Sequence, residues 1–140
     1  MRARARRHGV AALALALTLF TLAGCSEDRK FSAEEFVAEV KAEGVELELG
    51  DELVTTEDKE LYAVELEQVA RLPGEEGEHE HTGGSLSVYE NTAGADGEID
   101  SCRMSADLLC YQAANVVVVL EGGGIEAQQL GVAMERLSEE

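Results

Sequence analysis

The segment 75–81 carries the side chains best suited to chemistry, because it places two histidines among four glutamates. In an extended chain, a His-x-His pair directs both imidazoles to the same side. Imidazole combined with carboxylate is a ligand set that suits zinc, nickel or copper. We therefore consider a weak site for a divalent metal, for buffering or sensing, at Glu78, His79, Glu80 and His81. The simpler interpretation is a solvated hairpin tip in which histidine is tolerated.

The other patterns in the chain do not amount to an active site. Catalysis needs a positioned nucleophile, base or metal, and both histidines lie in a segment, 74–84, that has no apolar residue to hold them. The three glycines at 122–124 lack the Lys-Ser/Thr of a phosphate-binding loop. The alternating carboxylates at 96–100 lack the distal Glu of a calcium loop. We expect no enzymatic activity and no cofactor.

Residues 1–24 have the three parts of a secretory signal. Four arginines come first, followed by an apolar run from Val10 to Leu22 that is too short to span a bilayer of about 30 Å comfortably. The exit, Leu22-Ala23-Gly24, is followed directly by Cys25. This tetrapeptide resembles the lipobox of bacterial lipoproteins, in which Leu, a small residue and Gly or Ala precede a Cys. The resemblance implies cleavage before Cys25 and transfer of a diacylglycerol to its sulfur. An ordinary secretory signal is the alternative.

A diacylglyceryl group brings two acyl chains. Each buried methylene contributes about 0.8 kcal/mol, so two chains suffice for stable anchoring. The lipobox resemblance therefore implies a membrane-bound protein on the outer face of the cytoplasmic membrane or on the periplasmic side. The stretch from Cys102 to Gly122 also resembles small actinobacterial lipoproteins of unknown function, through its Cys-Tyr-Gln-Ala-Ala-Asn sequence and the valine run that follows. That resemblance implies no activity and no further functional residue.

The chain is strongly acidic, with 29 Asp and Glu residues against 11 Lys and Arg. Nucleic acid is excluded as a partner because phosphate binding needs a basic surface. Anionic lipid headgroups should also repel the domain, so that it sits off the membrane on its lipid anchor. The acidity fits a cationic partner or divalent cations. The simpler interpretation is solubility or a high-salt environment.

Cys102 and Cys110 remain once Cys25 is assigned to lipid. Outside the cytoplasm, an even number of thiols usually forms disulfides. For so short a loop, chain entropy gives a stabilisation of about 2–3 kcal/mol. We expect a structural Cys102–Cys110 disulfide. Free thiols or a redox pair are the alternatives, although the spacing is not the Cys-x-x-Cys of an oxidoreductase.

Hydrophobic periodicity and turn residues divide the chain after a short tether, 25–30, into seven elements. Ser32 and Glu35 form a capping box at the start of the first helix, with Phe31 and Phe36 placed as a hydrophobic staple. The expected helices are 33–43 and 125–139, and the poorly patterned stretch 91–105 allows a short helix around Ile99, Cys102 and Met104. The expected strands are 45–49, 61–66, 85–89 and 109–120, the last one central and covered on both sides. A polar turn is expected at 50–58 and a loop at 74–84.

The resulting order, α-β-β-β-α-β-α, predicts one α+β domain over 31–140. It should have two layers, an antiparallel sheet of about four strands with helices mainly on one face. Together with the lipobox, this predicts a lipid-anchored cell-envelope protein that works by binding, without catalysis. Its partner would be an envelope protein or a cell-wall component. The alternative is a metal-binding lipoprotein that uses the segment 75–81.

Overall fold

The computed structural model describes residues 29–67 and 81–139. The strands of this part join one antiparallel sheet in the order β1-β2-β3-β5-β4. The expected α+β class with an antiparallel sheet is confirmed, with five strands where about four were expected. In chain order the elements are α1 (Ala33–Ala42), β1 (Leu47–Thr55), β2 (Lys59–Glu67), β3 (His81–Tyr89), α2 (Thr92–Arg103), β4 (Leu109–Ala113), β5 (Val116–Leu120) and α3 (Ile125–Glu139).

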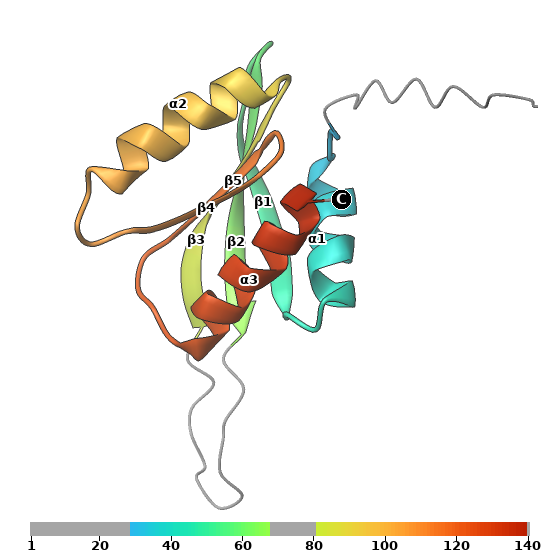
Figure 1. Ribbon diagram of the computed structural model, residues 1–140. Helices are drawn as coiled ribbons and strands as arrows, with labels where there is room; N and C mark the ends of the chain where they lie inside the picture. The colour runs from blue at the N-terminus through green and yellow to red at the C-terminus, as the bar shows by residue number, and fades with distance from the viewer. Residues whose placement is uncertain (1–28, 68–80, 140) are drawn as a thin grey trace, which may run out of the picture.

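The sheet has helices on both faces, in unequal number (Figure 1). α1 and α3 cover one face and build the main core there, around Phe36, Leu86 and Met134. α2 lies on the other face, where Ile99 packs against Val117 in a smaller cluster. β5 is therefore covered on both sides, as its unbroken run of valines predicted. Two of the three helices share one face, in line with the expectation, and α2 adds a partial third layer.

α1 begins where its sequence predicts. The Ser32 hydroxyl accepts a hydrogen bond from the Glu35 amide and the Glu35 carboxylate accepts one from the Ser32 amide, so the capping box is complete. The rings of Phe31 and Phe36 meet edge to face with their centroids 5.8 Å apart. Gly44 follows the helix with φ of 89°, a left-handed conformation that suits glycine. The expected helix 33–43 is confirmed.

β1 corrects the expected boundaries of the first strand and turn. It begins at Leu47 and continues to Thr55, so most of the expected polar turn 50–58 is strand. The register of β1 against β2 shifts twice between Leu49 and Val54. These irregularities interrupt the alternation of apolar and polar side chains on which the prediction depended. The strand therefore continues past the point where its sequence pattern stops.

The stretch 109–120 is a hairpin, and the prediction of one long strand there was wrong. β4 ends at Ala113 and β5 begins at Val116, so Ala114 and Asn115 form a two-residue turn. Ala114 has φ of 49°, a conformation that residues other than glycine adopt uncommonly. Such turns are usually marked by Asn-Gly or Asp-Gly. Neither dipeptide is present, so the valines alone suggested a continuous strand.

β3 begins at His81, so the last residues of the expected loop 74–84 belong to a strand. Gly84 pairs with Leu120 of β5. A Cβ atom at Gly84 would collide with the carbonyl oxygen of Val119. Glycine at this position therefore marks the close approach of two strands rather than a loop. The expected strand 61–66 and helix 125–139 are confirmed as β2 and α3, and the short helix expected within 91–105 is the longer α2, which begins at Thr92.

Candidate functional site

Most of the site residues predicted from the sequence lie outside the described residues. This holds for Cys25, Glu78, His79 and Glu80. His81 begins β3, but its side chain is also outside the description. Lipid attachment and metal binding therefore stay predictions. Among the residues that the structure describes, no group of three or more His, Cys, Asp or Glu side chains is placed to hold a metal ion.

The two remaining cysteines come together at the end of α2. Cys102 belongs to α2 and Cys110 to β4, and their Cα atoms lie 6.1 Å apart with the sulfur atoms at bonding distance. This Cα separation is within the range of protein disulfides. Cys102 is buried and Cys110 is half-buried. A bond here ties the last turn of α2 to the edge strand of the sheet.

Asn115 fixes the point where the N-terminal part of the chain joins the sheet. Its Oδ1 accepts a hydrogen bond from the Phe31 amide (2.8 Å), and its Nδ2 donates to the carbonyl oxygens of Phe31 (3.1 Å) and Tyr89 (2.8 Å). Asn115 is only 2% exposed. The Arg29 guanidinium lies 4.5 Å from the centre of the Phe31 ring. We call Arg29, Phe31 and Asn115 the N-terminal clamp.

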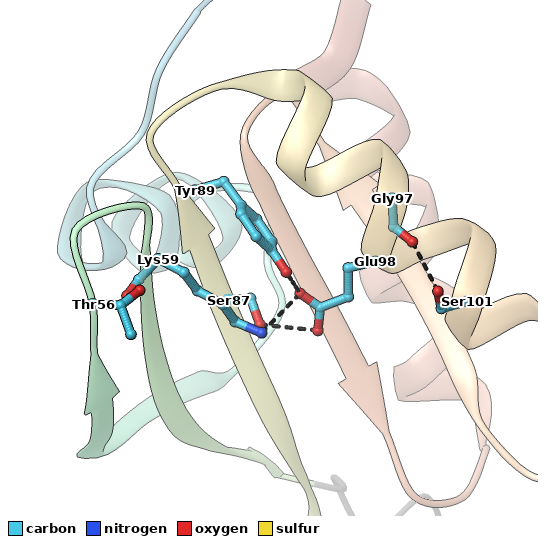
Figure 2. Close-up of polar contacts among 7 residues, drawn as sticks. All are labelled: Thr56, Lys59, Ser87, Tyr89, Gly97, Glu98 and Ser101. Atoms are coloured by element: carbon cyan, nitrogen blue, oxygen red, sulfur yellow. Dashed lines mark hydrogen bonds and ion pairs between the residues drawn. The ribbon is translucent and has the colours of Figure 1, made fainter.

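On the face that carries α2, Glu98 is surrounded by three donors from the sheet (Figure 2). The Ser87 hydroxyl donates to Oε1 (3.0 Å), the Tyr89 hydroxyl donates to Oε2, and the Lys59 ammonium lies 3.2 Å from Oε2. Lys59 also lies 5.2 Å from the centre of the Tyr89 ring. We call these four residues the Glu98 cluster. Burial and the hydrogen bond to Glu98 raise the pKa of Tyr89 above its usual value, so the phenol stays neutral at physiological pH.

The polar groups of the Glu98 cluster bind one another. The carboxylate accepts from both hydroxyls and is paired with the ammonium, and Ser87 is fully buried. A general base needs a lone pair directed at a substrate, and a serine nucleophile needs a base that can take its proton. In the Glu98 cluster, the carboxylate oxygens instead face donors that hold α2 against β2 and β3. The geometry therefore favours a structural role.

A groove of about 480 Å³ opens at the same end of the sheet as the N-terminal clamp. Its walls come from the start of α1, the turn 56–58, the end of β3 and Asn115. Because carboxylates outnumber ammonium groups along these walls, the groove attracts cations and repels anions. The charged residues that line it are Glu35, Glu57, Asp58, Glu60, Glu90, Lys30 and Lys59.

A second groove, of about 400 Å³, lies between the end of α1 and the outer side of α3. Ile125 and Val132 contribute apolar surface to it and are 46% and 50% exposed. Arg136 pairs with Glu43 at 2.8 Å across the groove. The second groove is therefore the more apolar of the two, and an ion pair bridges its walls.

Sequence reasoning missed both the N-terminal clamp and the Glu98 cluster. A signal for Asn115 was present, since a polar residue inside an apolar run needs hydrogen-bond partners when it is buried. No local signal marks Glu98, because it lies in α2 and its partners Lys59, Ser87 and Tyr89 come from the strands β2 and β3.

Two general findings bear on the assignment of function. In residues 29–67 and 81–139, no helix is long and apolar enough to cross a membrane. Comparison of the chain with protein-family models, with curated proteins and with solved structures found no match.

Proposed function

We propose that the protein is a lipid-anchored component of a bacterial cell envelope and acts there as a non-catalytic binding module. The observation that carries this proposal is the tetrapeptide Leu22-Ala23-Gly24-Cys25, placed directly after an apolar run of signal-peptide length. A diacylglyceryl group on the Cys25 sulfur holds the mature protein at the membrane surface. The partner is an envelope protein or a cell-wall component.

Two features of the folded domain support this proposal. α1 begins at Ala33, shortly after Cys25, and the N-terminal clamp fixes the chain just before the helix, so lipid on Cys25 keeps the whole domain close to the bilayer. The polar groups of the Glu98 cluster bind one another and hold α2 against the sheet. This arrangement favours a structural role for the cluster, which fits a protein that works without catalysis.

Removal of the Cys25 thiol tests the anchor. When a bacterium makes the full-length protein in the presence of an alkyne-tagged fatty acid, we expect the wild type to carry the tag. Cys25→Ala should carry none and should keep residues 1–24, because the acyl acceptor is missing. Cys102→Ala is the matched control, since it removes a thiol outside the tetrapeptide and should label like the wild type. Equal labelling of wild type and Cys25→Ala would contradict the proposal.

A further inference from the structure

One end of the sheet carries the start of the described chain. There Asn115 joins Phe31 to Tyr89, and the Glu90 amide donates a hydrogen bond to the Asp58 carbonyl (3.1 Å). The start of α1, the turn between β1 and β2, the end of β3 and the turn between β4 and β5 therefore meet at one place. We call this the tether end, because the chain leaves it towards Cys25.

The opposite end of the sheet is assembled from different parts of the chain. The Glu67 amide donates to the Glu46 carbonyl (3.1 Å), and the Glu121 amide donates to the Gly83 carbonyl (3.2 Å). The end of β2 and the starts of β1 and β3 therefore lie together (Figure 1). We call this the far end. β2 runs the whole way between the two ends, and its nine residues span about 27 Å at the usual strand rise of about 3.4 Å.

The distance from the lipid-bearing residue to the domain has an upper limit set by covalent geometry. Cys25 and Arg29 are four residues apart, and a fully extended chain spans at most about 3.6 Å per residue, so their Cα atoms lie within about 14 Å of each other. Arg29 is held at the tether end by its contact with the Phe31 ring. The lipid therefore attaches within a short reach of the tether end, while the far end lies about 27 Å beyond.

We propose that the anchored protein has a fixed polarity, with its tether end facing the bilayer and its far end facing away from it. The inference rests on the proposed lipid anchor and deepens it. The tether end is then the part of the domain nearest the lipid headgroups, and the far end is the part most distant from them. Glu67 and His81, which flank residues 68–80 in the sequence, both belong to the far end.

The charge of the tether end sets how closely it approaches the lipid. Its groove has five carboxylates against two ammonium groups and is therefore net negative. The residues are Glu35, Glu57, Asp58, Glu60 and Glu90, against Lys30 and Lys59. Anionic lipids give a membrane surface a negative potential that falls off within a Debye length, about 10 Å at 0.1 M salt. The tether end should therefore stand off an anionic bilayer at low salt. It should come closer to a neutral bilayer, or to an anionic one at high salt.

The absence of tryptophan from the chain makes this polarity measurable. We would couple the Cys25 thiol of the mature chain, 25–140, to a maleimide lipid in phosphatidylcholine vesicles that also contain a dansyl lipid. Glu57→Trp places a donor at the tether end and Glu121→Trp places one at the far end. Both positions are exposed and lose the same charge, so the two variants are matched. We expect energy transfer to the dansyl lipid to be several-fold stronger from position 57.

Equal transfer from the two positions, or stronger transfer from position 121, would overturn the polarity. Cys25→Ser controls for coupling through another thiol and should give no vesicle-bound protein. Because the lipid is attached chemically, this result is independent of whether a cell acylates Cys25. A failed polarity and a failed lipobox are therefore distinguishable.

Vesicles with added phosphatidylglycerol test the role of charge. At low salt, transfer from position 57 should fall relative to phosphatidylcholine vesicles, and it should recover when salt is raised. If energy transfer from position 57 changes with neither lipid charge nor salt, the proposed electrostatic repulsion between the tether end and an anionic bilayer is wrong.

Discussion

The buried side-chain amide of Asn115 makes the hydrogen bonds to Phe31 that a neighbouring strand would otherwise make. Phe31 packs next to the sheet but is not part of a strand. Its buried backbone N–H and C=O therefore need hydrogen-bond partners other than those of a neighbouring strand. Asn115 supplies both, an oxygen for the N–H and an NH₂ group for the C=O, and uses its second N–H for Tyr89. The side chain therefore couples the N-terminal segment to the end of β3. The polarity proposed for the anchored protein depends on this coupling.

On the other face of the sheet, Glu98 joins α2 to β2 and β3, so its replacement should lower the stability of the protein. Glu98→Gln removes the counter-charge of Lys59. It also places an NH₂ group opposite one of the two hydroxyls, Ser87 or Tyr89, which already donates. We expect a loss of about 1–3 kcal/mol in the free energy of unfolding, measured in urea. Asp100→Asn, at an exposed position of the same helix, is the control and should change stability by less than about 0.5 kcal/mol. Equal losses in both variants would contradict the structural role of the Glu98 cluster.

Among the three described helices, α2 has the weakest support from its own sequence. It contains Gly94 and Gly97, and an interior glycine costs about 1 kcal/mol relative to alanine. Only Ala95, Ile99 and Cys102 are buried in it. α1 and α3, in contrast, both contribute to the main core. α2 therefore depends on its attachments to the sheet. These include Asp96, which accepts a hydrogen bond from Gln112 of β4 (2.7 Å), Glu98 in the middle of the helix and Cys102 at its end.

The Cys102–Cys110 disulfide should stabilise α2 more than the other two helices. In the variant Cys102→Ala with Cys110→Ala, we expect stability to fall by about 2–3 kcal/mol, as chain entropy gives for so short a loop. Amide hydrogen exchange should accelerate more in α2 than in α1 or α3, because α2 opens locally when one attachment is lost. Mass spectrometry of unreduced peptides checks the bond itself. Free alkylation of both cysteines without reductant, or equal acceleration in all three helices, would contradict this.

The helices were predictable because their signals are local. The capping box at Ser32 and Glu35 and the apolar stripe of 125–139 each lie within one element. The strands were harder, because irregular pairing leaves no periodic trace in β1 and a two-residue turn at Ala114 lacks its usual glycine. The Glu98 cluster joins residues up to 39 positions apart in the sequence, Lys59 and Glu98. Partners at that separation are chosen by strand order and register, which no local pattern encodes.

The molecule as a whole combines a strongly acidic composition with an N-terminal tetrapeptide, Leu22-Ala23-Gly24-Cys25, that resembles a lipobox. Removal of residues 1–24 takes away four arginines and no acidic residue, so the mature chain is more acidic than the precursor. Electrostatics alone would keep such a domain away from an anionic membrane. The proposed location at the envelope surface therefore depends on the proposed covalent lipid. The attachment of lipid to Cys25 is the claim on which the proposed function and the proposed polarity both rest.

The mass of the N-terminal peptide tests that claim most directly. The full-length protein would be made in a bacterium, isolated from the membrane fraction and digested with trypsin. We expect a peptide that begins at Cys25, ends at Arg29 and carries a diacylglyceryl group on the cysteine sulfur. A peptide that begins before Cys25, or the same peptide with an unmodified cysteine, would contradict the account.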